Sequence, residues 1–241
     1  LTHSENEQWE RIKVRFESVC ASGKRHNVKI LIDAEESWIQ DAVDDLVLEL
    51  METFNTETLI VYSTLQTYRW DRLEYLKKIH VKAKQKNFKL GFKVVRGAYM
   101  EKERQRAQEK GYKSPICDSK AITDKLFNDT IQYSLSNLDT IHLFVGTHNE
   151  QSTHLAIELM KVCGISNNDP RVWFGQLYGM SDHISFNLAE HGYNVAKYVP
   201  FGPVKDVMPY LIRRAEENTS VAGQTSRELN LIKKEKQRRN V

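Results

Sequence analysis

Six short apolar runs in this 241-residue chain each end in a polar or charged side chain. The side chains at these ends are Asp33, Gln66, Arg96, His148, Gln176 and Tyr198. Carboxylate, amide, guanidinium, imidazole and phenol groups can bind and polarise a ligand. Buried parallel strands that each deliver one such group at their carboxyl end build the active site of a (β/α) barrel. The pattern therefore predicts an enzyme.

A second group of charged residues is concentrated near the carboxyl end of the chain. Arg213 and Arg214 are adjacent, and Glu217 follows them at the i+4 and i+3 positions of a helix. Two neighbouring guanidiniums form a fork for a carboxylate or a phosphate. A set of surface ion pairs would have the same spacing, so both interpretations stay open at this point.

Lys93 lies inside an apolar run, where a lysine is costly unless it is paired or functional. It could form a Schiff base, as in an aldolase, or place a cation beside an electron-rich cofactor. Arg96 and Gly97 follow the same run. The glycine would let a ligand approach the backbone and the arginine could meet a phosphate, although a simple strand-to-loop turn has the same pattern.

His148 could be an acid, a base or a positioning group. Asp33 ends a strand and is a site candidate, whereas Glu35 and Glu36 could charge the N-terminus of the following helix. No second histidine or carboxylate stands at metal-binding spacing from His148, so no metal site is expected. The chain also lacks the glycine-rich motifs of Rossmann dinucleotide sites and P-loops.

The elements that must position these groups can be predicted from hydropathy. Continuous apolar runs are typical of parallel strands that are buried on both faces, and we expect strands near 28–34, 58–66, 90–97, 142–148, 172–177 and 194–200. Amphipathic spacing predicts helices at 5–22, closed by Gly23, and at 38–54, 69–85, 118–135, 151–163, 182–191 and 203–218. An irregular loop around 111–115 is a candidate lid. This alternation favours most of a (β/α)8 barrel, with a flavodoxin-like doubly wound sheet as the alternative.

Composition narrows the class of protein. A net charge of +3, with 40% hydrophobic and 28% charged residues, describes an ordinary globular protein and gives no reason to expect nucleic-acid binding. Three cysteines without disulfide or metal spacing fit a reducing compartment. No apolar stretch approaches the roughly 20 residues that span a bilayer. We expect the basic segment 225–241 to be a solvated helical tail, with a contact to a membrane surface as the sharper alternative.

Taken together, these motifs resemble the flavin-dependent proline dehydrogenase family, and most closely its eukaryotic-like branch and bacterial relatives. The resemblance runs in order from about residue 5 to 225, and its most specific motifs are RGAY at 96–99 and RRxxEN at 213–218. The other matching segments are 33–36, Gln66, 93–95, 147–149, 174–180, 197–202 and 210–212.

The resemblance implies that 1–241 is one proline dehydrogenase domain with a distorted (β/α)8 TIM-type barrel, which holds FAD without a Rossmann fold. Two strands of the barrel are not visible in the sequence, and we expect them, with a substrate-binding lysine, to precede Leu1. The implied reaction is oxidation of L-proline to Δ1-pyrroline-5-carboxylate. Hydride would pass from proline C5 to flavin N5, and electrons would then pass to a membrane quinone.

The resemblance also assigns roles to particular residues. Arg213 and Arg214 would bind the proline carboxylate, and Asp33, Tyr198 and Leu177 would line the rest of the substrate site. Lys93 would lie near flavin N5, while Glu217 would hold the arginines or contact the flavin. The remaining contacts to the isoalloxazine and pyrophosphate would come from Gln66, Arg96, Gly97, Ala98, His148 and Asn149.

Two other functions and the cellular location stay open. A barrel aldolase would use Lys93 as its Schiff-base lysine, and an inactive partner subunit could lack the first strands altogether. For a bacterial source the resemblance implies a cytoplasmic protein with peripheral association to the inner membrane. For a eukaryotic source it implies the matrix side of the mitochondrial inner membrane. The sequence predicts no oligomeric state.

Overall fold

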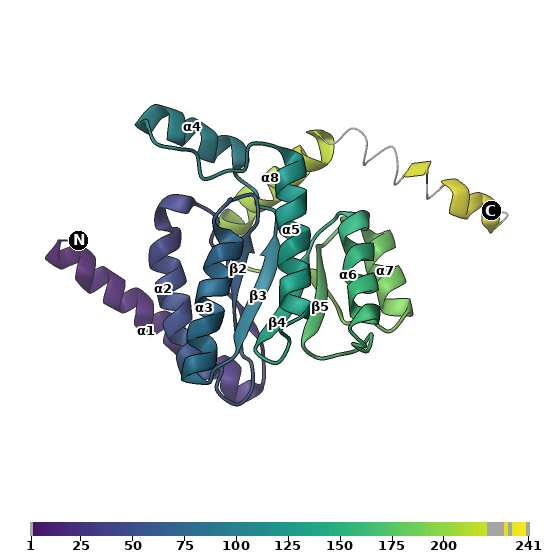
Figure 1. The fold of residues 1–241 in the computed structure, drawn as a ribbon. Coiled ribbons are helices and arrows are strands. Elements are labelled where there is room, and N and C mark those ends of the chain that lie inside the picture. Colours follow the sequence, from purple (N-terminus) through teal and green to yellow (C-terminus); the bar gives the residue numbers. More distant parts are fainter. Residues whose placement is uncertain (1, 221–228, 231–232, 240–241) are drawn as a thin grey trace.

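The computed structural model describes residues 2–220, 229–230 and 233–239, and its centre is a six-stranded parallel sheet (Figure 1). The spatial order of the strands follows their order in the sequence. The strands are β1 (Ile30–Leu31), β2 (Val61–Gln66), β3 (Leu90–Val95), β4 (Ile141–Gly146), β5 (Val172–Leu177) and β6 (Val195–Tyr198). The prediction of parallel βαβ units is therefore confirmed. The doubly wound alternative is wrong, because a doubly wound sheet reverses its strand order.

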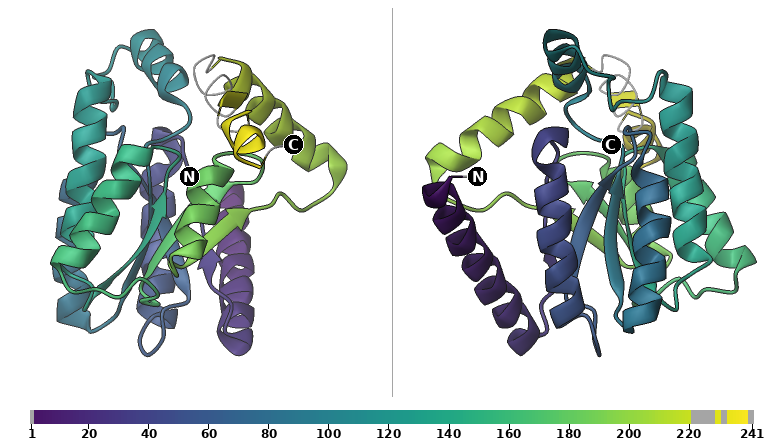
Figure 2. Two further views of the ribbon diagram at one scale, coloured as in Figure 1. Left: turned by 90° about the vertical axis from the view of Figure 1, so that its right-hand side faces the viewer. Right: turned by 60° about the vertical axis from the view of Figure 1, so that its left-hand side comes forward.

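Helices connect the strands and cover the outer face of the sheet. They are α1 (His3–His26), α2 (Ser37–Phe54), α3 (Arg72–Lys86), α4 (Met100–Lys110), α5 (Lys120–Leu135), α6 (Glu150–Val162), α7 (Asp182–Glu190) and α8 (Val204–Ser220). Figures 1 and 2 show α2, α3, α5, α6 and α7 against one face, whereas α4 and α8 lie near the carboxyl ends of the strands. This end of the sheet is where polar side chains were expected to gather.

The sheet is curled into a half-barrel. Lys29, at the start of β1, donates a hydrogen bond to the Pro170 carbonyl at 3.4 Å, and its Nζ lies 4.7 Å from the ring centroid of Trp173 on β5. Four strand spacings would separate β1 from β5 by about 19 Å in a flat sheet, which is beyond the reach of one side chain. Among the described residues, β1 pairs only with β2 and β6 only with β5. The structure is thus a curled parallel half-barrel, and no closed barrel is seen.

The strand register decides which side chains face the inside of the half-barrel. Side chains alternate along a strand, and residues that are partners on neighbouring strands share a face. Phe92 faces outward, where it packs with α2 and α3, so its neighbour Lys93 faces inward. Thr64 is the register partner of Lys93, and Gln66 follows it two residues later on the same face. Thr64, Gln66 and Lys93 therefore line the inner wall.

Two glycines make room for rings within the half-barrel. A Cβ added to Gly91 would lie 2.8 Å from Cγ of Tyr62, and one added to Gly175 would overlap the ring of Phe144. Both rings are bulky groups on the neighbouring strand, so they need a partner without a side chain. The inner space is thus partly filled by aromatic rings.

One local prediction is wrong, and one helix was not predicted. Gly23 does not end the first helix, which continues to His26 and stops at Asn27 in the left-handed conformation. Gly23 serves close packing instead, since an added Cβ would lie 2.8 Å from both Ile30 and Val28. Helix α4 was not predicted because it has little apolar face, with only Glu103 and Ala107 buried.

The candidate lid around 111–115 follows α4 and is tied to the loop after β2. The Trp70 amide donates to the Pro115 carbonyl at 3.1 Å, and the Cys117 amide donates to the Tyr68 carbonyl at 2.7 Å. Arg69 and Ile116 add an isolated antiparallel bridge. These contacts attach the carboxyl-terminal end of the candidate lid to the loop that follows β2.

The basic tail is described only in part. Residues 233–238 are helical, and Glu235 pairs there with Arg238 and Arg239 at 2.7 Å. Residues 225–228, 231–232 and 240–241 of the predicted tail lie outside the described residues. Among the helices of the described part, none is both long and apolar enough to cross a membrane.

Candidate active site

An ion pair lies on the inner wall at the carboxyl ends of the first strands. Lys93 Nζ is 2.5 Å from Asp33 Oδ1, and the Thr64 hydroxyl donates to the same carboxylate oxygen at 2.6 Å. The pairing explains how a lysine can lie in an apolar strand. It also brings together two of the predicted site residues, Lys93 and Asp33, from strands that are not neighbours.

Glu35 joins this group, although the sequence analysis gave it only to the N-terminus of the next helix. Its Oε2 accepts a hydrogen bond from the Ala98 amide at 3.3 Å. Burial raises the pKa of Glu35 to about 7, opposed by the Ala98 hydrogen bond and by Lys93. Its place directly after Asp33 and Ala34, in a segment that already matched the family, was the available signal.

A carboxylate of helix α4 accepts hydrogen bonds from the N-terminus of α2. The Ser37 amide and hydroxyl both donate to Glu103 of α4 at 2.6 Å, and Glu103 is fully buried. Glu36 pairs instead with Lys102 of α4 at 3.1 Å. A carboxylate at a helix N-terminus is favourable, and here it fixes α4 beside the segment that carries Asp33 and Glu35.

Gln66 is fully buried at the end of β2. Its Nε2 donates to the Ala34 carbonyl and, at 3.1 Å, to Gln40 Oε1 of α2. Its Oε1 has no hydrogen-bond partner among the described residues. A buried acceptor without a partner in a native fold calls for an explanation, and an absent ligand is one.

Arg96 is held by internal partners on three elements. Its guanidinium donates to Asp124 Oδ1 at 2.7 Å, to Thr147 Oγ1 at 3.0 Å and to Ser152 Oγ at 2.9 Å. It also lies 4.4 Å from the ring centroid of Phe127. Arg96 therefore joins β3 to α5 and to the start of α6. A contact from Arg96 to a phosphate stays a prediction.

The structure gives a reason for glycine at position 97 that the sequence analysis missed. Its φ is +129°, and an added Cβ would overlap the ring of Tyr68. Only glycine adopts this conformation readily, and only glycine leaves room for the ring. The close approach seen at Gly97 is thus from a protein side chain, and the predicted approach of a ligand is untested.

His148 and Asn149 start the loop after β4. His148 Nδ1 forms a hydrogen bond with the Ser181 hydroxyl at 3.0 Å, and burial, with Lys197 and Arg214, lowers the pKa of His148 to about 4. The imidazole is therefore neutral near pH 7 and offers one donor and one acceptor. The Asn149 side chain accepts from the Ser152 amide at 2.9 Å and caps α6. Its role at the site is structural so far.

Leu177 and Tyr198 are register partners at the ends of β5 and β6. The Tyr198 ring lies edge-on to Tyr210 of α8, with centroids 5.4 Å apart. Gln176 points the opposite way, since it bonds the Thr147 carbonyl at 3.2 Å and the Ser185 hydroxyl at 2.8 Å under α7. Five of the six polar strand ends remain site candidates, and Gln176 is a buried structural residue.

Helix α8 carries the paired arginines to the same end of the half-barrel. The Arg213 guanidinium lies 5.9 Å from the ring centroid of Tyr99, which belongs to the RGAY motif, and that of Arg214 lies 5.3 Å from Tyr210. The side chain of Glu217 lies outside the described residues, so its predicted contact with the arginines is not part of the structure. Two motifs that are over a hundred residues apart therefore meet through Arg213 and Tyr99.

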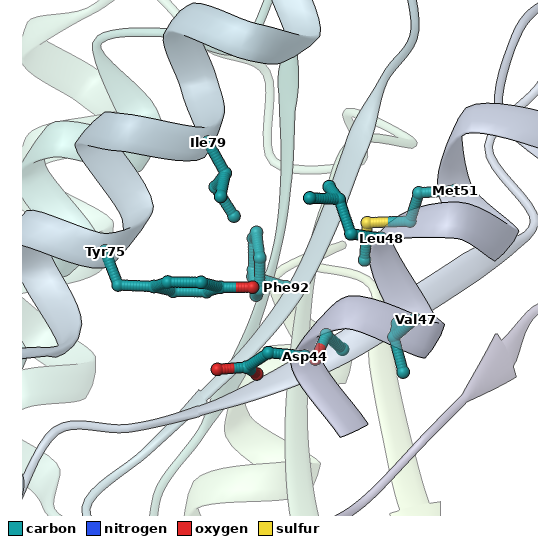
Figure 3. Close-up of a pocket in the computed structure, with 8 residues that line it drawn as sticks. Asp44, Val47, Leu48, Met51, Tyr75, Ile79 and Phe92 are labelled. Carbon is teal, nitrogen blue, oxygen red and sulfur yellow. The ribbon is translucent and has the colours of Figure 1, made fainter. Parts of the chain in front are cut away.

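A narrow space lies away from these residues, on the outer side of the sheet (Figure 3). It is lined by Asp44, Val47, Leu48, Met51, Ser63, Tyr75, Ile79 and Phe92, and it is too narrow to admit a water molecule. It belongs to the core between α2, α3 and the sheet. Among the described residues, no cluster of three His, Cys, Asp or Glu side chains could hold a metal ion.

Comparisons with known proteins agree with the geometry. A family model described as "Proline dehydrogenase" matches residues 2–227. The carbapenem antibiotics biosynthesis protein CarD of Pectobacterium carotovorum subsp. carotovorum is 40% identical, over 97% of this chain and 60% of that protein. Human mitochondrial proline dehydrogenase 1 is 37% identical, over 96% of this chain and 39% of that protein.

A solved structure supports the fold as well. The crystal structure of proline utilization A from Bdellovibrio bacteriovorus, inactivated by N-propargylglycine, superposes with a TM-score of 0.82 at 25% identity. The match covers 90% of this chain and 22% of that protein, so this chain spans only part of the length of its relatives. Because the family model matches nearly all of it, the chain belongs to the proline dehydrogenase family.

Proposed function

We propose that the protein oxidises L-proline to Δ1-pyrroline-5-carboxylate with FAD as the hydride acceptor. The observation that carries this proposal is the meeting of Arg213 with Tyr99, which brings the paired arginines to the end of the half-barrel where Lys93 and Asp33 lie. A cationic fork beside a polar inner wall suits a small substrate with a carboxylate. Family membership gives the reaction class.

The residues present fit a flavin. Gln66 offers a buried acceptor without a partner, which a ring N–H could use, and neutral His148 offers a donor and an acceptor. Lys93 places a cation on the same wall, where negative charge on a reduced flavin would be stabilised. FAD, when bound, would supply two-electron oxidation and later pass the electrons to a quinone. The residues that would hold it are Gln66, Lys93, Arg96, Gly97, Ala98, His148, Asn149 and Glu217.

The chain's own residues would bind and orient the substrate. Arg213 and Arg214 would fix the carboxylate, and Tyr198 and Leu177 would pack on the pyrrolidine ring, with Asp33 at the edge of the site. Loss of hydride from C5 leaves a C=N bond, so the ring nitrogen must first lose a proton. Two guanidiniums on one carboxylate supply the orientation that this transfer needs. Activity is expected to rise with pH as the amine is deprotonated.

A closed, distorted (β/α)8 barrel is the architecture that this function calls for. The edges of β1 and β6 have no further strand partner among the described residues, and two added strands would pair both. The whole segment 1–241 would be part of that one domain, and an added strand would bring a further lysine to the carboxylate. The alternative of an inactive subunit requires that no such strands exist.

The partners and location follow from the same family. Relatives from human, fly and plant carry the word mitochondrial in their names. For a eukaryotic source we propose the matrix side of the inner membrane, and for a bacterial source a cytoplasmic protein on the inner membrane. A membrane quinone would be the electron acceptor. The basic helix at 233–238 is a suitable contact for anionic lipid.

The proposed function is tested by flavin spectroscopy on the full chain. Purified protein should carry flavin absorbance that L-proline bleaches without oxygen. Protein that takes up no FAD, or whose bound flavin keeps its absorbance with proline, would contradict the proposal. Borohydride trapping of a carbonyl substrate on Lys93 would instead identify an aldolase, which nothing in the comparisons favours.

A further inference from the structure

We propose that Gln40 and Asp44 of α2, with Arg72 of α3, form a positioning relay that holds the Gln66 amide with its oxygen directed at the flavin. The relay lies behind the inner wall and contacts no substrate. The inference rests on the proposed binding of FAD, and it adds three positioning residues that the motifs did not contain. It follows from which atoms can donate and which can only accept.

The relay starts at a buried ion pair. Arg72 Nη1 is 2.6 Å from Asp44 Oδ2, and both side chains are about 5% exposed or less. Burial raises the pKa of Asp44, and the Arg72 guanidinium opposes that rise. A carboxylate paired at this distance stays ionised and can only accept hydrogen bonds. Asp44 is therefore a fixed acceptor.

Asp44 fixes the orientation of the Gln40 amide, which in turn fixes that of Gln66. Its Nε2 donates to Asp44 Oδ1 at 2.8 Å, and the side chain is buried. If the amide were reversed, its oxygen would face the carboxylate, and two acceptors would repel each other. Gln40 must therefore turn its Oε1 toward Gln66. The chemistry of the neighbours therefore decides which end of each amide is the oxygen.

Gln66 is then oriented by two acceptors. Its Nε2 donates to Gln40 Oε1 at 3.1 Å and also to the Ala34 carbonyl. Neither oxygen can donate, so the Gln66 amide cannot reverse without losing both bonds. Its Oε1 is thereby left as the free end, and it has no hydrogen-bond partner among the described residues.

The Gln66 side chain leaves β2 on the inner face of the half-barrel. Gln66 follows Thr64 by two residues on β2, and Thr64 bonds the Asp33 carboxylate that pairs with Lys93. A buried acceptor without a partner is costly, and a ligand N–H that reaches it removes the cost. The isoalloxazine carries a ring N–H when oxidised and gains another when reduced. A reversed Gln66 would present its own N–H groups and oppose that contact.

A double-mutant cycle tests the relay. FAD affinity of the apoprotein is measured by flavin fluorescence titration for wild type, Gln40→Met, Gln66→Met and the double variant. Gln40→Met and Gln66→Met should each weaken FAD binding about tenfold, as expected for a hydrogen bond in a buried site. In the Gln66→Met background, Gln40→Met should have no further effect. Effects that multiply, or a Gln40→Met variant that binds FAD like wild type, would overturn the relay.

A second set of variants separates polarity from stability. Asp44→Asn can donate to Gln40, so it frees both amides to reverse, and FAD binding should weaken about tenfold. The double variant Gln40→Glu with Asp44→Asn moves the carboxylate from position 44 to position 40. The Gln66 amide must then donate to this carboxylate, so its oxygen again faces the flavin and FAD affinity should be restored. Equal weakening in the single and paired variants would mean that only the ion pair matters, and would sink the relay.

The control for general damage is Asp71→Asn. Asp71 bonds Arg72 Nη2 at 3.1 Å and also Arg69, but it lies outside the relay. This variant should lower the melting temperature and keep wild-type FAD affinity; weakened affinity in it would count against the relay. If wild type itself binds no FAD, the proposed function fails and the relay fails with it.

Discussion

In the wall formed by β1, β2 and β3, most polar side chains have a partner within the protein, whereas the wall formed by β6 and α8 leaves large side chains exposed. Asp33, Lys93 and Arg96 are all paired on the first wall. On the second wall Tyr198 is 52% exposed and Ile212 51% exposed. The first wall is thus assembled before any ligand arrives, while the second has surface left to cover.

This difference suggests that the two walls bind different molecules. A pre-formed polar wall lowers the entropy lost when a rigid cofactor binds, which suits the flavin side. The exposed wall offers a surface for the substrate or further parts of the protein to cover, since a contiguous apolar patch is typical of an interaction site. If this is correct, changes on β6 and α8 should affect proline. Changes on β1 to β3, apart from Asp33 at the edge of the substrate site, should affect the flavin.

The largest expected effect is on the second wall. Arg213→Met should raise the KM for proline about 30- to 1000-fold, or roughly 2–4 kcal/mol, because a charged contact to the carboxylate is lost. FAD affinity should not change. Steady-state kinetics and a flavin titration measure both quantities. Arg238→Met, in the basic tail, is the matched control and should leave both unchanged.

The same experiment can show that the assignment of the two walls to flavin and proline is wrong. An unchanged KM in Arg213→Met would remove Arg213 from the substrate site. A loss of FAD with a normal KM would place it on the cofactor side instead, and α8 would then belong with the first wall.

On the first wall, Lys93→Ala should slow flavin reduction by proline about 100-fold, since a preorganised charge beside the developing negative charge is lost. The KM for proline should change little. Stopped-flow absorbance without oxygen measures the rate. Lys89→Ala, just before β3, is the control, because the exposed Lys89 ammonium donates to the Asp139 carbonyl at the surface. Equal reduction rates in wild type and Lys93→Ala would refute the role.

Arg96 tests whether the first wall is rigid because of its internal partners. Arg96→Met removes three hydrogen bonds, and Lys120 is then the one cationic partner left to Asp124 within the described part of the chain. The free energy of unfolding should fall by about 2 kcal/mol, as measured by chemical denaturation. Lys125→Met removes an exposed pair with Asp129 and should cost about 0.5 kcal/mol or less. Similar losses in the two variants would show that Arg96 is not a structural hub.

The strands could be predicted because burial on both faces requires a continuous run of apolar residues. The side that each residue faces could not, because a continuous apolar run has no alternation to show it. Gln176 was grouped with the site for this reason, and only its register with Lys197 and its bonds under α7 place it outward. Helix α4 was missed because a solvated helix needs no apolar stripe.

The site divides in the same way. The sequence analysis named residues inside motifs, whereas it did not name Gln40, Asp44 and Glu103, which contact this region from helices whose sequence looks ordinary. Their roles depend on contacts between segments 26 to 66 residues apart, such as Gln40 with Gln66 and Ser37 with Glu103. Spacing within one element predicts which side chains share a face, and it carries no information about such long-range partners.

The smallest expected effect is the pH dependence that Glu35 contributes. Burial raises its pKa from 4.5 to about 7 in the folded protein, so the folded state binds more protons than the unfolded state between these values. Stability from this group therefore falls as pH rises from about 4.5 to 7. His148 acts in the opposite sense, because its pKa is lowered from 6.5 to about 4 and its neutral form is favoured in the fold.

A comparison of Glu35→Gln with wild type isolates the Glu35 contribution, since His148 is common to both proteins. Relative to the variant, wild type should be more stable at pH 5 than at pH 8, by about 1 kcal/mol after allowance for solvent screening near Lys93 and Asp33. Urea unfolding of the apoprotein at the two pH values measures the difference. A difference that does not depend on pH would mean that Glu35 is ionised throughout. Glu35 would then add a second carboxylate charge beside the Asp33–Lys93 pair across this pH range.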